Sequence, residues 1–191
     1  MLEGLVNMPN WCNNDVQISH PDSAMIDKLE SAVKEGKWFT TIMPEPDWEN
    51  MPNEKGEFSK EEKLTPDLSI TRWPDGKQDE RWYSWRLENW GTKWEVSDFY
   101  NDTRYQNELT LSFPTAWSPP IAIYEALVDQ GYSVKAYYME PGCDFAGKWE
   151  DYEEDHIDGL SEYTNDWFEH NPLGQQLEQY YNILEMREEF C

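Results

Sequence analysis

The chain has 191 residues, a formal net charge of −24, and 11 Trp and 11 Tyr residues. This length predicts one domain with embellishments. An aromatic content of 15% argues against a disordered chain, because disordered chains are poor in aromatic residues. The negative charge disfavours direct binding to DNA, RNA or anionic membranes through phosphate contacts.

The cysteines and the apolar segments indicate in which cellular compartment the protein is found. Cys12, Cys143 and Cys191 are an odd number, and no pair has metal-ligand spacing, which favours a reducing cytosol. No basic region followed by an apolar run opens the chain, so no signal peptide is predicted. No stretch approaches the roughly 18–20 apolar residues that span a bilayer. We therefore predict a cytoplasmic protein without a cofactor.

The first part of the chain predicts a strand followed by a helix. In residues 12–20, Val16 and Ile18 alternate with polar residues, which is the period of a half-buried strand. Apolar residues then recur at helical spacing in residues 22–36, and Gly36 ends this helix.

A long polar connection follows. Residues 47–77 are rich in charges and prolines, which predicts an excursion with little regular structure. Residues 79–89 predict a short helix capped by its first residue, with Trp82, Trp85 and Asn89 on one face.

The second half of the chain predicts a hairpin, a helix and a strand. Residues 94–100 and 108–113 are interpreted as two strands joined by a turn at 101–102. Residues 118–131 predict a helix with proline in its first turn, and residues 132–140 alternate as a fourth strand.

The order strand, helix, strand, strand, helix, strand predicts an α+β fold of the split βαβ, ferredoxin-like type. It has an antiparallel four-stranded sheet with two helices on one face. Residues 146–152 are a candidate extension of this sheet. The long connection after the first helix becomes an insertion at about 47–77.

The C-terminal part has a different composition. Residues 140–191 contain 15 acidic and 2 basic residues, so −13 of the charge lies there. Residues 173–190 predict a terminal helix. Its apolar side is formed by Leu177, Tyr180, Tyr181, Leu184 and Met186. We predict a ferredoxin-like domain at 8–147 and an acidic C-terminal extension at 148–191.

Five short motifs carry a family resemblance. They are Met8-Pro9-Asn10-Trp11-Cys12-Asn13, Pro44-Glu45-Pro46, Asn89-Trp90-Gly91-Thr92-Lys93-Trp94, Phe113-Pro114-Thr115-Ala116-Trp117-Ser118-Pro119-Pro120 and Glu140-Pro141-Gly142-Cys143-Asp144-Phe145-Ala146-Gly147. In this order they resemble the motifs of the YubB ferredoxin-like family. The resemblance implies a ferredoxin-like fold and an origin in bacteriophages, plasmids or mobile islands, but no reaction. The residues before Met8 and the acidic C-terminus depart from the family pattern.

The motif residues allow two interpretations. In one, polar and aromatic side chains converge on one side of the sheet and bind a small ligand or a nucleobase. The candidate ligand-binding residues are Asn13, Glu45, Asn89, Lys93, Trp94, Trp117 and Glu140. In the other, the tryptophans are core residues and Lys93 forms a structural ion pair with Glu45 or Glu140.

The acidic C-terminal part also allows two interpretations. Carboxylates interleaved with aromatic residues suit a protein interface, or a mimic of a phosphate track. The candidate partner-binding residues are Trp149, Glu150, Asp151, Tyr152, Glu153, Glu154, Asp155, Asp158 and Trp167. The alternative is a solvated acidic surface.

No catalytic or metal site is predicted. His20, His156 and His170 have no nearby nucleophile pattern, and no glycine-rich phosphate loop occurs. A calcium-loop spacing that begins at Asp151 has His156 where the loop needs glycine.

These patterns predict a small phage or mobile-element accessory protein that acts by binding. Its partner would be a host or defence protein, possibly one that normally binds nucleic acid, which the protein inhibits or redirects through its acidic surface. The alternative prediction is a protein that binds or sequesters a small ligand in a Trp-lined pocket.

Overall fold

The structure is a computed structural model that describes residues 10–65 and 68–189. Met8 and Pro9 of the first motif, and Phe190 of the predicted terminal helix, lie outside the described residues. No helix in the described part is long and apolar enough to cross a membrane.

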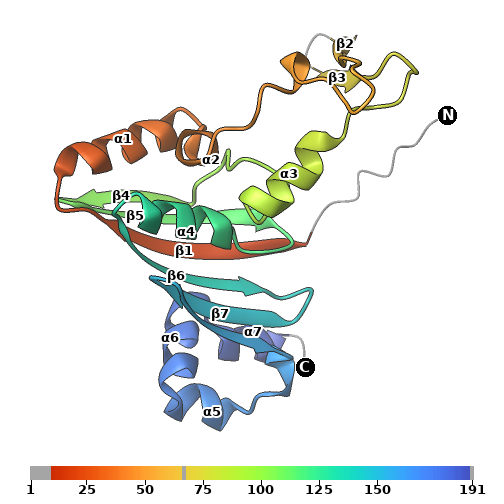
Figure 1. Cartoon of the computed structure of the whole chain (residues 1–191). Helices are drawn as coiled ribbons and strands as arrows, with labels where there is room; N and C mark the ends of the chain where they lie inside the picture. Colours follow the sequence, from red (N-terminus) through yellow and green to blue (C-terminus); the bar gives the residue numbers. More distant parts are fainter. Residues whose placement is uncertain (1–9, 66–67, 190–191) are drawn as a thin grey trace.

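One antiparallel sheet organises the molecule (Figure 1). Its strand order is β4-β5-β1-β6-β7-β8. The bounds are β1 Trp11–Ser19, β4 Asn101–Tyr105, β5 Glu108–Ala116, β6 Ser133–Glu140, β7 Phe145–Glu150 and β8 Glu153–Asp158. The first four strands in this order have the split βαβ arrangement that was predicted. The prediction of a four-stranded sheet was wrong, because β7 and β8 extend it to six strands. β7 overlaps the candidate extension at 146–152, whose last two residues form the turn into β8.

The face of the sheet toward α1, α2 and α4 carries the first core (Figure 1). The covering helices are α1 Ser23–Lys34, α2 Trp38–Ile42 and α4 Ile121–Asp129. Trp38, Phe39 and Phe113 pack ring against ring, with Trp38 and Phe113 centroids 4.8 Å apart. Asn14 is the polar centre of this core. Its Nδ2 donates to Thr115 Oγ1 (2.8 Å), and its Oδ1 accepts from Tyr124 (3.2 Å).

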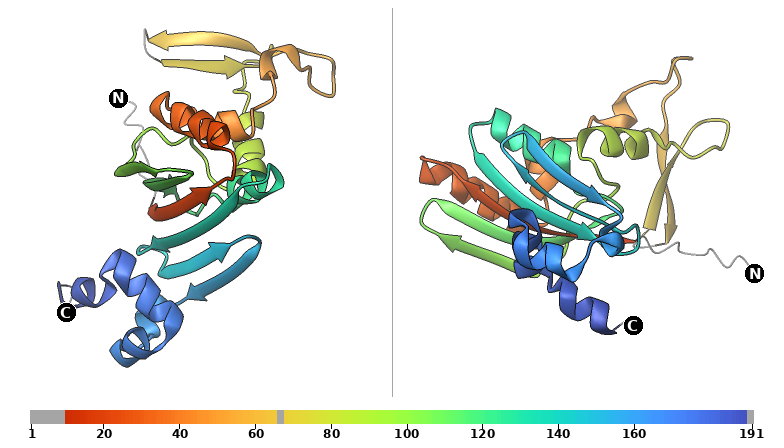
Figure 2. Two further views of the ribbon diagram at one scale, coloured as in Figure 1. Left: turned by 90° about the vertical axis from the view of Figure 1, so that its left-hand side faces the viewer. Right: turned by 90° about the horizontal axis from the view of Figure 1, so that it is seen from below.

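The opposite face carries a second core, over the β6–β7–β8 part only. Three short helices cover it, α5 Asn165–His170, α6 Pro172–Tyr181 and α7 Ile183–Glu189. They follow the turn η2, Leu160–Glu162. Figure 2 shows that these helices lie on the far side of the sheet from α1 and α4. Phe168, Leu177 and Ile183 pack there against Met139 and Ile157.

The predicted terminal helix is divided. Asn182 adopts a left-handed conformation (φ 49°) between α6 and α7, and α5 was not predicted. The prediction of the apolar side is confirmed, since Leu177, Tyr180, Tyr181, Leu184 and Met186 all belong to the second core.

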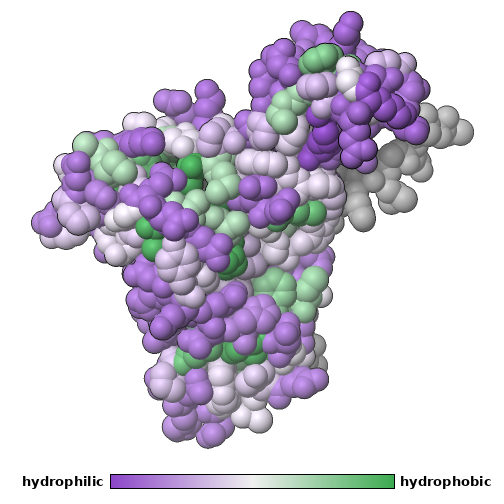
Figure 3. Space-filling view, viewed as in Figure 1, coloured by the Kyte–Doolittle hydropathy of each residue, from purple (hydrophilic) through white to green (hydrophobic). Residues whose placement is uncertain are grey.

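The prediction that residues 47–77 have little regular structure was wrong. They contain the turn η1 Trp48–Asn50 and a hairpin of β2 Lys60–Thr65 and β3 Leu68–Arg72. This insertion projects from the body and presents a mostly hydrophilic surface (Figure 3). A hairpin of this kind is missed because its strands pair with each other outside the core, so β2 is exposed throughout and has no apolar alternation.

Arg81, at the start of α3 (Arg81–Asn89), attaches the insertion to the body. Its guanidinium donates to the carbonyls of Trp48 and Met51 (2.9 Å each) and to the buried Asp79 (2.7 Å). It also lies over the rings of Trp48 and Trp73. The pKa of Asp79 is lowered because, although burial raises it, hydrogen bonds from Arg81 and Ser59 outweigh that effect.

The hairpin of the second half is shifted along the chain relative to its prediction. The strand expected at 94–100 is irregular, and the expected turn residues 101–102 begin β4 instead. The true turn lies at Gln106, which adopts φ 52°. Glu95 explains the irregular stretch, because its carboxylate accepts from the N–H groups of Phe39 and Thr40 (2.8 Å each) at the start of α2.

Candidate functional site

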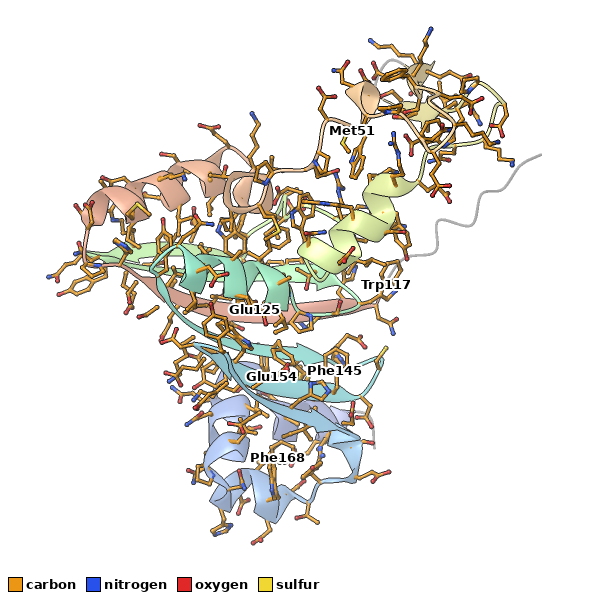
Figure 4. The ribbon with its side chains drawn as sticks, viewed as in Figure 1. Met51, Trp117, Glu125, Phe145, Glu154 and Phe168 are labelled. Atoms are coloured by element: carbon orange, nitrogen blue, oxygen red, sulfur yellow. The ribbon has the colours of Figure 1, made fainter. Side chains whose placement is uncertain are left out.

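Several of the sequence motifs meet at one end of the sheet, where β1 begins and β5 ends. We call this region the motif end, and Trp117 marks it in Figure 4. The backbone N–H of Trp117 donates to the Asn10 carbonyl (2.9 Å). Thr92 donates to the Ala116 carbonyl (3.0 Å) and Ser118 to that of Gly91 (2.6 Å). Hydrogen bonds therefore join the first, third and fourth sequence motifs at this end of the sheet.

Gly91 is required at this contact. Its φ is 80°, and a Cβ there would lie 3.2 Å from the backbone of both Pro119 and Ile121. Only glycine satisfies the left-handed turn and the close approach together. The turn out of α3 at 90–92, which was predicted, thus sets how α3 meets the start of α4.

An aromatic cluster lies at the surface of the motif end. We call Trp11, Trp94 and Trp117 the tryptophan cluster, with Trp94 centroids 6.1 Å from Trp11 and 6.0 Å from Trp117. Lys93 Nζ lies 4.6 Å from the Trp94 ring centroid, 5.4 Å from Trp117 and 5.5 Å from Tyr83. The cation thus stabilises the rings through cation–π contacts. Trp11 remains 46% exposed.

The structure brings together three of the seven candidate ligand-binding residues, namely Lys93, Trp94 and Trp117. Asn89 donates back to the Trp85 carbonyl (2.9 Å). Asn13 shares a face of β1 with Trp11, and its carbonyl accepts from the Tyr181 hydroxyl of α6 (3.4 Å).

The two carboxylates of that set have other partners than Lys93. Glu45 accepts from Arg86 Nε (2.6 Å) and Trp48 Nε1 (3.2 Å). Glu140 is buried and accepts from the N–H groups of Gly142 (2.9 Å) and Cys143. Neither pairs with Lys93 as the structural interpretation expected.

Arg86 is a residue that the sequence analysis missed. Its guanidinium lies 5.1 Å from the Trp82 ring centroid and 4.7 Å from that of Trp90, and it pairs with Glu45. The signal was in the sequence, because Trp82 and Trp90 lie four residues before and after Arg86. Trp82 and Trp90 therefore hold the guanidinium of Arg86, whose pairing with Glu45 attaches α3 to the body.

A small cavity of about 220 Å³ adjoins the tryptophan cluster. Trp11 and Trp94 line it, together with residues 95–98 and 114–116. It is smaller than the roughly 300–1,000 Å³ of most small-molecule sites.

A second candidate site is the edge strand β8. Glu153, Glu154, Asp155 and Asp158 are all exposed on it, and β8 pairs only with β7 among the described residues. We call this strand and its carboxylates the acidic edge; Glu154 is labelled in Figure 4. The turn into it, Asp151-Tyr152, has positive φ at both residues, 43° and 74°. Exposed charges are a common means of protecting a strand edge from self-association.

The tryptophans expected at the acidic surface lie elsewhere. Trp149 is 1% exposed and packs against Tyr124 in the first core. Trp167 is half-buried against Gly174, and a Cβ added to Gly174 would lie 2.8 Å from the Trp167 ring. Tyr152 is 53% exposed and donates to Asp129. Glu150 pairs with Lys148.

The acidic edge is tied to the sheet through Tyr138. Its hydroxyl donates to Glu154 (2.6 Å) and lies 2.9 Å from His156 Nδ1. Burial and this carboxylate raise the Tyr138 pKa, so the hydroxyl stays protonated and donates. Gly147 makes room for it, since a Cβ there would lie 2.3 Å from the Tyr138 oxygen.

The residues of the calcium-loop spacing lie mainly on a strand, and His156 and His20 contact nearby residues of the chain. Asp151 lies in the turn before β8 and Glu153 and Asp155 lie on the strand itself, not in a loop. His156 Nε2 is 3.1 Å from Asp158, and His20 accepts from the Asp22 N–H (3.0 Å).

One family model and one solved structure are similar to this chain. Residues 89–177, which run from the end of α3 into α6, match the family model described as "Ferredoxin-like domain in Api92-like protein". A crystal structure of protein api92 from Yersinia pseudotuberculosis is similar, with 8% identity and a TM-score of 0.44 over 78% of this chain and 98% of that one. No curated protein matches. Residues 89–177 are therefore similar to the ferredoxin-like domain found in Api92-like proteins.

Proposed function

We propose that this protein is an accessory protein of a bacteriophage or another mobile element, with the YubB-like origin that its motifs suggest. It acts in the cytoplasm of a bacterial host by binding a host or defence protein, which it inhibits or redirects. The acidic edge is its binding surface. The observation that carries the proposal is an open strand edge that is lined by carboxylates.

The open edge supports binding by strand addition. An unpaired edge offers backbone N–H and C=O groups to a strand of another chain. Glu153, Asp155 and Asp158 repel a second copy of this acidic chain and attract a basic strand. The edge therefore favours a cationic partner.

The direction of the side chains supports a partner with a cationic groove. In the register of β8 with β7, Glu153 and Asp155 share the face of Glu150, whereas Glu154 and Asp158 share the face of Trp149. Carboxylates thus flank the edge on both sides. A protein that normally encloses nucleic acid presents cations on both walls of its groove, so the acidic edge would compete with that ligand.

The test is a pull-down from the host lysate with a charge-reversed variant, Glu153→Lys/Asp155→Lys/Asp158→Lys. Glu154 is left in place because it holds Tyr138. The matched control, Glu49→Lys/Glu54→Lys/Glu61→Lys, makes the same change in net charge at exposed carboxylates of the insertion. We expect a nucleic-acid-binding protein to be retained at low salt by the unchanged protein and the control, but not by the edge variant.

Two results would contradict this proposal. Retention that is insensitive to salt would remove its electrostatic basis. Equal loss of the partner with the edge variant and the control would show an effect of total charge, without a role for β8.

A second candidate function is favoured by the tryptophan cluster. Trp11 is 46% exposed beside a cavity of about 220 Å³, which suits a single flat ring. A small ligand that copurifies with the protein and is lost in Trp11→Ala, while the melting temperature is unchanged, would support it. If Lys93→Met lowers the melting temperature and no ligand is found, the cluster is structural.

A further inference from the structure

A further cavity lies in neither candidate site. It measures about 520 Å³ and lies at the edge of the second core, between the β6–β7 turn, η2 and α7. We call it the C-terminal cavity. Its volume falls within the roughly 300–1,000 Å³ of small-molecule sites, in contrast to the cavity at the motif end.

The walls of the C-terminal cavity are mainly apolar. Met139 comes from β6, Leu160 from η2, and Ile183 and Met186 from α7. Ile183 and Leu160 are buried and belong to the second core. An apolar group that enters this cavity exchanges water for these side chains, which is favourable in proportion to the area buried.

Arg187, the cation of the lining, is already bound by the chain itself. Its guanidinium donates to the carbonyls of Leu160 (2.5 Å) and Tyr163 (2.6 Å) and to Asn165 Oδ1 (3.3 Å). It also lies 4.7 Å from the Phe168 ring centroid. Its donors are thus directed to oxygens of η2 and α5, which makes it a structural clamp for the second core.

The two carboxylates of the lining outweigh that cation. Asp144 accepts from the N–H (2.8 Å) and hydroxyl (2.6 Å) of Ser161, and Glu188 is exposed at the rim. Two carboxylates against one guanidinium leave the lining with one net negative charge. The surrounding chain has a net charge of −24, so the potential at the mouth of the cavity is negative.

We propose that the C-terminal cavity binds a small amphipathic cation. The apolar body of the ligand lies against Met139, Ile183 and Met186, and its ammonium group lies at the rim near Glu188. The proposal does not depend on the function of the acidic edge, because β8 carboxylates do not line this cavity.

The experiment uses three probes with the same eight-carbon chain, namely octylammonium, octyl glucoside and octanoate. Titration is followed by NMR of the methionine methyl groups, because Met139 and Met186 line the cavity whereas the exposed Met51 lies on the insertion. We expect octylammonium to shift Met139 and Met186 but not Met51. Its affinity should exceed that of octyl glucoside, and octanoate should bind weakest.

Variants separate the apolar and the electrostatic contributions. Met186→Trp fills the cavity and should weaken all probes by at least about tenfold. Glu188→Lys should weaken octylammonium by about tenfold and leave octyl glucoside unchanged. Glu185→Lys is the matched control, since it is exposed on the same helix but does not line the cavity. It should change neither probe by more than about twofold.

Several outcomes would overturn the proposal. They are octanoate binding as tightly as octylammonium, shifts at Met51 in place of Met139 and Met186, or equal effects of Glu188→Lys and Glu185→Lys. A chain that ends at Glu189 should bind octylammonium as the full chain does. Binding found only in the shortened chain would overturn the proposal for the 191-residue chain.

Discussion

The two faces of the sheet carry cores of different kinds. The first core is continuous and aromatic, with Trp38, Phe39 and Phe113 fully buried. The second covers only β6, β7 and β8 and is closed by three short helices. Both depend on β6, where Ala136, Tyr137, Tyr138 and Met139 are consecutive buried residues. A strand buried on both faces loses its alternation, and β6 is therefore the element that joins the two cores.

The remainder of the second face stays polar. On β1, this face begins with the exposed Trp11 and continues with Asn13, Asp15, Gln17 and Ser19, which are all partly exposed. They alternate with the buried Cys12, Asn14, Val16 and Ile18. The comparison teaches that the C-terminal helices bury their apolar residues against β6, β7 and β8, whereas α6 reaches the polar residues of β1 through the Tyr181 hydroxyl, which donates to the Asn13 carbonyl (3.4 Å).

The largest effect is expected from Phe113→Ala. This residue is fully buried on β5 among Trp38, Phe39 and Phe99. Truncation should lower the free energy of unfolding by about 3–5 kcal/mol. The measurement is urea unfolding followed by tryptophan fluorescence. A loss below about 1 kcal/mol would show that the aromatic cluster is not the centre of the first core.

Leu177→Ala tests whether the second core is separable. Leu177 is fully buried on α6, and truncation should cost about 2–5 kcal/mol. We expect hydrogen exchange to increase throughout α5–α7 while α1 and α4 keep their protection. Equal loss of protection in α1 would mean that the two cores unfold as one unit. The matched control is Leu87→Ala, which removes an exposed leucine on α3.

A smaller effect should appear between Tyr137 and Tyr180. Their rings stack with centroids 4.3 Å apart and join β6 to α6. A double-mutant cycle with Tyr137→Leu and Tyr180→Leu should give a coupling energy of about 0.5–1.5 kcal/mol. Additive effects would show that the docking of α6 rests on its aliphatic contacts.

The smallest effect concerns Asp15, which lies on the second face beside α6. Burial raises its pKa, and hydrogen bonds from Ser112 and Tyr181 offset this only in part. Since the folded state then binds the proton more tightly than the unfolded state, this group lowers stability as the pH rises through its folded pKa. Asp15→Asn should therefore raise the melting temperature at neutral pH by ~2–4 °C.

The pH dependence provides the control for that substitution. Below both pKa values, the carboxyl is protonated in the folded and unfolded states, so the difference between Asp15→Asn and the unchanged protein should disappear. Thermal unfolding by circular dichroism across acidic pH measures this. A stabilisation that persists at low pH would have a cause other than the charge of Asp15.

The sequence by itself determined the central strands and helices. Val16 and Ile18 in β1, and the apolar stripes of α1 and α4, have the period of the element they form because one side of each is buried. The order of these elements predicted the ferredoxin-like arrangement. Lys93, Trp94 and Trp117 also converge as the site hypothesis required, although the other four residues of that set do not.

Only the tertiary structure decided which polar segments become strands and where the cavities lie. β8 has one buried residue, Ile157, and β2 has none, so their pairing depends on neighbouring backbone and not on an apolar pattern. The pairing of Glu45 with Arg86 and the clamp formed by Arg187 join residues far apart in the chain. Such contacts depend on how the folded elements approach one another, which the local periodicity of a sequence does not record.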